Sequence, residues 1–371
     1  LDDLLTGRVA ISAIRKVELE DLLGRDRVDL DEAGLSGLLQ DKTVLISGAG
    51  GSIGTELCRQ IARFNPRLMV FVEQSEFALY GVEQEFAGRR VACVIGDVKD
   101  ASRMQAVCAE YRPDVVFHAA AYKHVPLMEC ANAWEAVKNN VQGTLTVARA
   151  ALAAGTGEFV LISTDKAVNP TNVMGASKRL AEVVCQAVQA QGSATRFVMV
   201  RFGNVLGSSG SVIPLFREQI ARGGPVTVTH PEIIRYFMLI PEAAQLVLQA
   251  GLMAARDAEG GRVFVLDMGE PVKIVDLARD MIRLSGFSED EIRIEFTGLR
   301  PGEKLFEELL ADADATLSTP HPKLRIARSS AIPDAAWLAE LEAWLAEPWR
   351  DEAAVKAGLR RWVPEYRPAV N

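Results

Sequence analysis

Basic residues are in deficit in this sequence. The 41 Lys and Arg stand against 49 Asp and Glu, which gives a formal net charge of -8 and a pI near 5.3. Broad binding of nucleic acid needs a clustered surplus of Lys and Arg to neutralise phosphates. The composition therefore argues against a nucleic-acid partner, and any anionic ligand has to meet a local basic pocket.

Cysteine is also scarce and irregularly spaced. No two cysteines form a CxxC pair, and they are Cys58, Cys93, Cys108, Cys130 and Cys185. An odd number of scattered cysteines fits neither a disulfide framework nor a zinc site. We expect reduced thiols in a cytosolic compartment and no metal centre.

Long apolar runs are missing. None reaches the roughly 18 to 20 residues that a membrane-spanning helix needs, and no signal peptide stands at the start. The chain as given is not expected to cross a bilayer. Residues 1–40 are rich in charge, carry no nucleotide-binding motif and begin at Leu1 rather than Met. We interpret 1–40 as a linker segment whose upstream part has been removed.

What is present is a regular alternation of two patterns. From residue 42 onward, short β-rich apolar runs alternate with longer amphipathic stretches typical of helices. The expected strands are 43–47, 68–72, 91–96, 114–120, 158–163 and 196–202. This alternation predicts an α/β fold, a doubly wound parallel sheet of the Rossmann type, over residues 41–206.

The remaining 165 of the 371 residues follow a different pattern. Glycine and proline clusters interrupt the alternation after residue 206, and we interpret 207–330 as a smaller α/β domain that binds substrate. The segment 331–371 holds four of the five tryptophans at spacings that suit helices packed onto the body. We expect a helical C-terminal tail there, anchored in the core.

A glycine-rich turn joins the first expected strand to the first helix. The sequence TVLISGAGGSIG places Gly48, Gly51 and Gly54 at this turn, and Ser52 and Ile53 lie between the last two of them. One glycine permits a tight turn, one lets the backbone approach a pyrophosphate, and Gly54 lets helix and strand pack closely. We assign all five residues to binding a dinucleotide.

The ends of the next two strands complete the predicted cofactor site. Glu73 ends the second strand, where a carboxylate accepts hydrogen bonds from ribose hydroxyls and repels a 2'-phosphate. This favours NAD, although Arg63 or a neighbouring basic residue leaves NADP open. Asp97 and Val98 follow the third strand and are assigned to the adenine pocket, with a simple turn as the alternative for Asp97.

Small and basic residues follow the fourth strand. Ala119, Ala120 and Ala121 leave room for the cofactor's ribose and nicotinamide. Lys123 and His124 come next. A His beside a Lys is usually a surface or core feature, but ligands bind at the carboxyl ends of parallel strands. We expect either residue to contact a substrate phosphate or sugar.

The segment STDKAVNPTNVMGASK carries the predicted chemistry. Thr164, Asp165 and Lys166 end the fifth strand. Lys178 lies on the next helix and is assigned to the catalytic set as the lysine that binds the cofactor by holding the nicotinamide ribose. Dehydrogenases with this fold place a proton-transferring Tyr four residues before that Lys, and Met174 stands there instead. Because methionine transfers no proton, Asp165 and Lys166 have to serve as acid and base, with Thr164 as hydrogen-bonding partner. A surface ion pair is the structural alternative for Asp165 and Lys166.

Together these motifs resemble the membrane-anchored UDP-N-acetylglucosamine 4,6-dehydratases of bacterial polysaccharide biosynthesis, an extended short-chain dehydrogenase/reductase family. The resemblance spans about residues 15–330 through GAGGSIG, AAYKHVPLME, STDKAVNPTNVMGASKR, VRFGNVLGSSGSVIPLF, RYFM and RPGEKLFEEL. It implies an NAD-dependent dehydratase for a UDP-N-acetylhexosamine. It also implies a cytoplasmic catalytic domain tethered to the inner membrane by an anchor outside this sequence, and a homo-oligomer.

The resemblance further implies that Asn204, Arg235 and Arg300 help bind the nucleotide diphosphate, because a guanidinium bonds phosphate oxygens in pairs. Each has a structural alternative. Asn204 could cap a turn, Arg235 could pair with Glu232, and Arg300 could lie in solvent.

The expected reaction oxidises sugar C4, removes water across C5 and C6, and returns hydride to C6. We assign Lys166 as the C5 base, with its pKa lowered by burial, and Asp165 as the acid, with its pKa raised; the exchanged roles stay open. A nucleotide-sugar 4-epimerase shares the fold and the first step. A non-catalytic NAD-binding protein would fit the missing tyrosine. The Asp165–Lys166 pair favours elimination over both.

Overall fold

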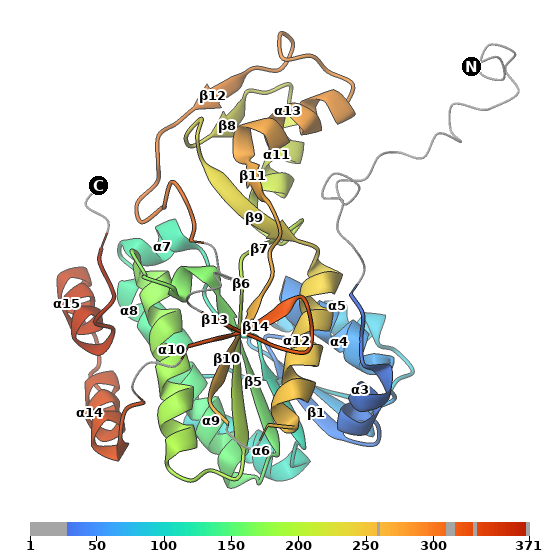
Figure 1. The fold of residues 1–371 in the computed structure, drawn as a ribbon, viewed down its shortest axis with the longest axis vertical. Coiled ribbons are helices and arrows are strands. Elements are labelled where there is room, and N and C mark those ends of the chain that lie inside the picture. Colours follow the sequence, from blue (N-terminus) through green and yellow to red (C-terminus); the bar gives the residue numbers. More distant parts are fainter. Residues whose placement is uncertain (1–27, 258–259, 309–315, 329–331, 369–371) are drawn as a thin grey trace, which may run out of the picture.

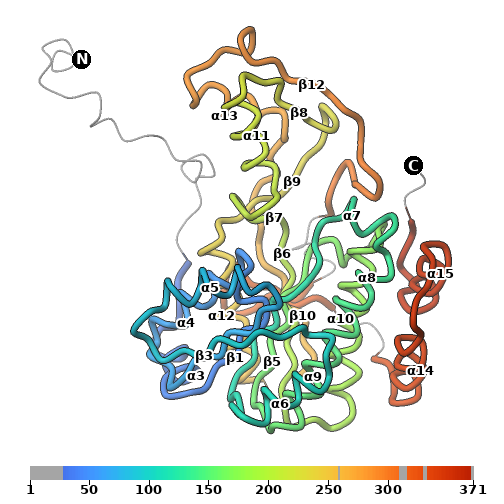
Figure 2. Tube along the Cα trace, turned by 180° about the vertical axis from the view of Figure 1, so that it is seen from behind, coloured from blue at the N-terminus to red at the C-terminus, as the bar shows by residue number. Residues whose placement is uncertain are grey.

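The computed structural model describes residues 28–257, 260–308, 316–328 and 332–368. Its main body is one large sheet with helices on both faces (Figures 1 and 2). The strands are β1 (Thr43–Ser47), β2 (Leu68–Glu73), β3 (Val91–Ile95), β4 (Val115–His118), β5 (Glu158–Thr164), β6 (Arg196–Phe202), β10 (Arg262–Leu266), β13 (Thr316–Ser318) and β14 (Leu324–Ala327). Their order in the sheet is β13-β14-β10-β6-β5-β4-β1-β2-β3.

Strands β1 to β6 are the ones that the apolar runs predict, and they are all parallel. Every residue of β1 and β4 is buried, as expected for strands covered on both faces. From β1 the order proceeds to β2 and β3 on one side and to β4, β5 and β6 on the other. The predicted doubly wound α/β fold is confirmed, and its reversal lies between β1 and β4.

The sheet continues beyond β6 with strands from later in the chain. β10 pairs with β6 in parallel, β14 pairs antiparallel with β10, and β13 pairs antiparallel with β14. The VFVL run of β10 is buried, so it serves as another interior strand. The segment 207–330, predicted as a separate substrate-binding domain, is thus divided between the main sheet and a second lobe.

The second lobe stands beyond the carboxyl ends of the parallel strands (Figure 1). Its elements are β7 (Asn204–Val205), α11 (Val212–Ala221), β8 (Val226–Val228), β9 (Ile234–Met238), β11 (Pro271–Lys273), α13 (Ile274–Leu284) and β12 (Ile294–Phe296). The strands form the sheet β11-β9-β7 and the pair β12-β8. Phe216 of α11 and Met281 of α13 belong to the core of this lobe, which is distinct from the cores of the main sheet.

Two helical layers cover the main sheet. One contains α3 (Glu32–Leu39), α4 (Ser52–Ala62), α5 (Glu76–Glu85) and α12 (Ile240–Ala255). The other contains α6 (Ala101–Tyr111), α7 (Val125–Glu129), α8 (Ala133–Val137), a π-helical turn (Lys138–Gln142), α9 (Gly143–Ala153) and α10 (Val173–Ala190). No helix in the described ranges combines the length and the hydropathy of a membrane span.

Part of the predicted linker is helical. Residues 1–27 of that segment lie outside the described residues, whereas α3 packs on the main body. Asp31 caps α3 by accepting a hydrogen bond from the Gly34 amide at 2.8 Å. Leu35 and Leu39 are fully buried. This end of the segment is therefore part of the folded body.

The C-terminal tail forms α14 (Ala335–Leu345) and α15 (Glu352–Trp362), which lie against the α8–α10 layer (Figures 1 and 2). Its rings join one aromatic cluster: Trp344 lies 5.2 Å from Trp134, and Trp337 lies 5.5 Å from Trp362, between ring centroids. Trp349 is 66% exposed and takes no part. Aromatic packing thus holds the tail on the main body.

Candidate active site

The glycine turn connects β1 to α4 at the carboxyl edge of the sheet. Gly48 has a positive φ of 70°, and a Cβ there would lie 2.6 Å from the Ala120 nitrogen. A Cβ on Gly54 would lie 2.0 Å from the Gly48 oxygen. On Gly51 the nearest atom to a Cβ is the Gly48 oxygen at 3.3 Å. The protein's own packing thus requires Gly48 and Gly54, whereas a Cβ on Gly51 would make one tight contact, with the Gly48 oxygen, and would otherwise face the space beyond the turn.

The start of α4 faces this space. Gly51 is its N-cap and has no side chain with which to cap the helix, and no other described side chain is recorded as doing so. Ser52 lies beside Ser209 of the second lobe, with 3.3 Å between the hydroxyl oxygens, and Ile53 packs on the core. The first amides of α4 are therefore left without a side-chain acceptor at a position suited to an anion.

The residues predicted around the adenosine end make local bonds. Glu73 accepts hydrogen bonds from the Gly50 amide at 3.2 Å and the Ser75 amide at 3.0 Å, so it supports the glycine turn. Asp97 accepts from the Lys99 amide at 2.9 Å and pairs with the Lys99 ammonium at 3.4 Å. The turn role considered for Asp97 is thus present, and Val98 beside it is buried.

The predicted alanines and basic residues continue this edge. The Ala119 amide donates to the Ser47 oxygen at 3.0 Å, which fixes the start of the Ala119–Ala121 stretch beside β1. Lys123 donates to the Ser208 hydroxyl at 3.4 Å. Burial lowers the pKa of His124, and the positive charges of Lys123 and Arg300 lower it further. The structure therefore brings these three basic residues into one region, across the two lobes.

The predicted catalytic residues form a buried cluster at the end of β5. The Lys166 ammonium lies 2.9 Å from Asp165 Oδ1 and donates to Asn204 Oδ1 at 3.2 Å. Thr164 donates to the same Asp165 oxygen at 2.8 Å. The carboxylate of Glu307 lies 3.5 Å from the Lys166 ammonium. The Asp165 side chain is 3% exposed and that of Lys166 16%, which rules out the surface ion pair considered above.

The charge state of Lys166 differs from the expectation. Burial alone would lower its pKa, but the carboxylates of Asp165 and Glu307 outweigh burial and hold the pKa above its ordinary value. The predicted lowering is therefore wrong. The prediction considered the burial of Lys166 and did not include the second carboxylate, which comes from the distant RPGEKLFEEL motif.

Lys178 presents the opposite case. Its residue is only 4% exposed, and burial lowers its pKa to about 8. Among the described residues, none accepts a hydrogen bond from its ammonium. Met174, one turn earlier on α10, is buried in the core and supplies no polar atom from its side chain. A largely buried ammonium needs hydrogen-bond acceptors, and the described side chains supply none, so this position suits a ligand with hydroxyl groups.

The chain matches the model of the family described as "Polysaccharide biosynthesis protein" over residues 44–329. Capsular polysaccharide biosynthesis protein CapD of Staphylococcus aureus is 56% identical over 315 residues, 84% of this chain and 52% of CapD. The chain belongs to this polysaccharide biosynthesis family. The family-level resemblance inferred from the motifs is confirmed, and the chain spans about half the length of CapD.

More distant relatives of this family member carry names of enzymes. "UDP-N-acetylglucosamine 4,6-dehydratase (inverting)" of Campylobacter jejuni is 30% identical, covering 76% of this chain and 81% of its own. "UDP-glucose 4-epimerase" of Rickettsia massiliae is 32% identical over 74% and 79%. The X-ray structure of Pen from Bacillus thuringiensis, 34% identical, superposes with a TM-score of 0.70 over 80% of this chain and 88% of Pen. The family thus groups with nucleotide-sugar dehydratases and epimerases.

Arg235, predicted to help bind the nucleotide diphosphate, has several partners within the protein. Its side chain is 9% exposed and donates to the backbone oxygens of Ile234 and Lys304, at 2.6 and 2.8 Å. It also pairs with Glu303 and Glu307 at 3.5 and 3.7 Å, not with Glu232. Arg300 pairs with Glu303 at 3.1 Å. In this family member both arginines therefore contact the 300–308 segment, and their binding of a nucleotide diphosphate stays a prediction.

Glu307 is the functional-site residue that sequence reasoning missed. It lies in the motif RPGEKLFEEL, which contains several acidic residues, and nothing in the sequence distinguishes Glu307 as the buried one. In the structure, Asn204 does not cap a turn and instead accepts from Lys166. The positions of Glu307 and Asn204 beside Lys166 therefore depend on long-range contacts, which the spacing of residues in the sequence does not reveal.

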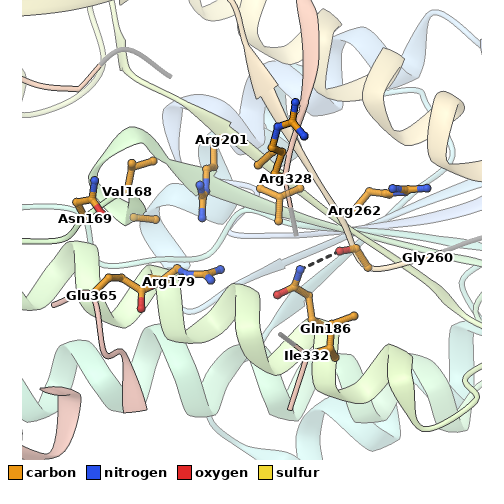
Figure 3. Close-up of a pocket in the computed structure, with 14 residues that line it drawn as sticks. Val168, Asn169, Arg179, Gln186, Arg201, Gly260, Arg262, Arg328, Ile332 and Glu365 are labelled. Atoms are coloured by element: carbon orange, nitrogen blue, oxygen red, sulfur yellow. Dashed lines mark hydrogen bonds and ion pairs between the residues drawn. The ribbon is translucent and has the colours of Figure 1, made fainter. Parts of the chain in front are cut away.

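A cavity of about 290 Å³ is lined by residues other than those predicted to bind the cofactor (Figure 3). It is lined by α10, β10 and the tail, and Arg179, Arg201, Arg262 and Glu365 are among its residues. Ala167, Val168 and Asn169, which directly follow Asp165 and Lys166 in the chain, also line it. The cavity therefore adjoins the segment that follows this pair.

Proposed function

We propose that this chain catalyses NAD-dependent 4,6-dehydration of a UDP-N-acetylhexosamine, with UDP-GlcNAc as the first candidate. The observation that carries the proposal is the buried Asp165–Lys166 pair at the end of β5, combined with Met174 at the usual tyrosine position. Elimination needs an acid and a base beside C5 and C6, which this pair supplies. The name of the Campylobacter relative supports the same reaction.

The residues present fit NAD. The start of α4 at Gly51 and the Lys178 ammonium, which has no hydrogen-bond partner among the described residues, would hold the pyrophosphate and the ribose. Glu73 would lie near the adenosine ribose and disfavour a 2'-phosphate. When bound, NAD accepts hydride from the sugar and returns it. We assign Ala119–Ala121, Asp97 and Val98 to the remainder of the cofactor surface.

Because three acceptors surround the Lys166 ammonium, we assign it as the donor at the C6 hydroxyl. Asp165 then accepts the C5 proton through Oδ2, which has no hydrogen-bond partner among the described residues. This exchanges the two roles first assigned from the sequence. The proton of the C4 hydroxyl leaves to solvent when C4 is oxidised, water later leaves from C6 with the Lys166 proton, and Lys166 regains a proton from solvent. Asp165 returns its proton to C5.

The second lobe and the basic residues near it are assigned to the nucleotide sugar. Lys123 and Arg300 supply positive charge at the junction of the lobes, where a diphosphate would bind, and His124, whose pKa they lower, would offer a neutral imidazole as a hydrogen-bonding group. Asn204 is assigned to the sugar end, through its bond to Lys166. From the family resemblance we also propose tethering to the inner membrane and a homo-oligomer.

Incubation with UDP-GlcNAc tests the reaction. NMR and mass spectrometry should show the loss of one water and a new C6 methyl group. A product of unchanged mass, UDP-GalNAc, would favour the epimerase, as the name of the Rickettsia relative suggests. No turnover by folded, NAD-loaded protein would favour the non-catalytic binding protein.

Paired variants test the proton roles. Asp165→Asn should abolish exchange of the C5 proton with heavy water, because a carboxamide accepts no proton. Lys166→Met should still exchange this proton but accumulate keto sugar that has not lost water. Exchange that survives in Asp165→Asn and disappears in Lys166→Met would restore the original assignment.

A further inference from the structure

Glu182 on α10 is a fully buried carboxylate with several partners. It accepts hydrogen bonds from the Ser163 hydroxyl at 2.6 Å and from both ends of the Arg201 guanidinium, at 2.7 and 2.5 Å. Arg179 donates to it at 3.2 Å. One carboxylate therefore joins β5, β6 and α10.

Each partner is close in sequence to a residue of the candidate active site. Ser163 precedes Thr164 and Asp165 on β5, Arg201 lies on β6 just before Asn204, and Arg179 directly follows Lys178. Glu182 itself lies one turn beyond Lys178 on α10, and its recorded hydrogen bonds and ion pairs within the described residues go to Ser163, Arg179 and Arg201 rather than to Asp165 or Lys166. It is placed to fix the strands that carry the acid–base pair relative to the helix that carries the cofactor lysine.

The C-terminal tail reaches the same network. Glu365 accepts from Arg179 Nε at 2.6 Å, at the cavity drawn in Figure 3. The Arg367 amide donates to the Pro170 oxygen at 2.9 Å, within the catalytic segment. The tail therefore braces both the start of α10 and the loop before it.

A second brace runs through α7. Lys356 of the tail pairs with Glu129 at 2.9 Å, and Glu129 accepts from the Val173 amide, the first of α10, at 2.8 Å. The tail thus fixes α10 from two sides, within six residues of Lys178.

We propose that Glu182 is a positioning residue for this active site, and that the C-terminal tail acts with it through Glu365 and Arg179. Together they hold Lys178 at the fixed distance from Asp165 and Lys166 that a shared cofactor and sugar require. The proposal rests on the proposed dehydration for its catalytic consequence, but not for its effect on cofactor binding. A misplacement of about 1 Å far from the reacting atoms can cost about 100-fold in rate.

The first test compares Glu365→Gln with Glu340→Gln. Glu340 also lies on the tail, where it pairs with Arg361 at 2.6 Å and touches no part of the site. Both variants should fold with the thermal stability of the parent. Glu365→Gln should raise the Kd for NAD about 5-fold, and Glu340→Gln should leave it unchanged. Equal affinity in the two variants would overturn the role of the tail.

The second test removes the centre of the network. Glu182→Gln leaves the buried Arg201 charge uncompensated, which endangers folding, whereas Glu182→Gln with Arg201→Met removes both charges of the pair and should fold. This double variant should bind NAD about 10- to 100-fold more weakly and lose kcat, with the KM for UDP-GlcNAc within about 2-fold. A folded double variant with parental NAD affinity and kcat would refute Glu182 as a positioning residue.

The two proposals fail separately. If the parent shows no dehydration but the NAD affinities separate as predicted, the proposed function fails and the positioning network stands. If dehydration proceeds and the affinities of Glu365→Gln and Glu340→Gln coincide, only the positioning role of the tail fails.

Discussion

Lys178 gives the sharpest prediction, because we expect its buried ammonium to destabilise the cofactor-free protein while it contributes to cofactor binding. Its pKa falls from an ordinary 10.5 to about 8, mainly through burial, and the Glu182 charge offsets only part of this. Its ammonium has no hydrogen-bond partner among the described residues. Replacing it with methionine removes the charge and roughly preserves the side-chain length. Lys178→Met should therefore stabilise the cofactor-free protein.

The magnitude follows from the pKa. A fall from 10.5 to about 8 corresponds to about 3 kcal/mol, since one pKa unit is worth about 1.4 kcal/mol. Below pH 8 both the folded and unfolded states carry the charge, so the full penalty is present. Between pH 8 and 10.5 the folded state loses its proton first, and the penalty fades. The advantage of Lys178→Met should thus be largest near pH 7 and shrink toward pH 10.

Denaturant unfolding of both proteins at pH 7 and pH 10, without NAD, measures this difference. Other groups titrate in both proteins and largely cancel. Lys356→Met is the matched control, because the bonds of Lys356 to Glu129 and Glu352 outweigh burial and raise its pKa, so its loss should destabilise at pH 7. Saturating NAD should stabilise the parent but not Lys178→Met. The reasoning is refuted if Lys178→Met is less stable than the parent at pH 7, or if its advantage does not shrink with pH.

Two further predictions concern the glycine turn and α10. Gly51→Val should remain folded but lose NAD, because its side chain would occupy the side of the turn that the pyrophosphate approaches; Gly54→Ala should destabilise the fold, because its Cβ would lie only 2.0 Å from the Gly48 oxygen, against 3.3 Å for a Cβ on Gly51. Titration with NAD and thermal unfolding separate the two, and undiminished NAD binding by Gly51→Val would remove the assignment. Met174→Ala should keep substantial activity, at a stability cost of about 2–5 kcal/mol for the cavity. An inactive variant that still folds and holds NAD would show that Met174 takes part in the chemistry.

The parallel strands were predictable because each is a short apolar run bounded by polar or glycine residues, which is a local signal. The place of β10 in the main sheet was not predictable from the sequence. Its VFVL run resembles the runs of the other strands, and only its long-range pairing with β6 shows to which sheet it belongs. The helix α3 escaped notice because its apolar residues are few, and its burial depends on α12, far along the chain.

The candidate site shows the same division. Gly48 and Gly54 could be predicted from the sequence because a tight turn and close helix–strand packing require glycine at these positions. The Asp165–Lys166 pair could be predicted because it directly follows a strand. The raised pKa of Lys166 could not be predicted in this way, because it depends on Glu307, which only the folded chain brings within 3.5 Å of the ammonium. Arg235 was assigned to substrate from the family pattern, and its partners in the 303–307 segment became visible only in the structure.

The most direct test of the proposed dehydration uses UDP-GlcNAc carrying deuterium at sugar C4. The account predicts a product that is one water lighter and carries the deuterium in its new C6 methyl group, because the hydrogen leaves C4 and returns to C6 within one active site. Mass spectrometry and deuterium NMR read out both features. Deuterium retained at C4, or a C6 methyl group without deuterium, would contradict the account.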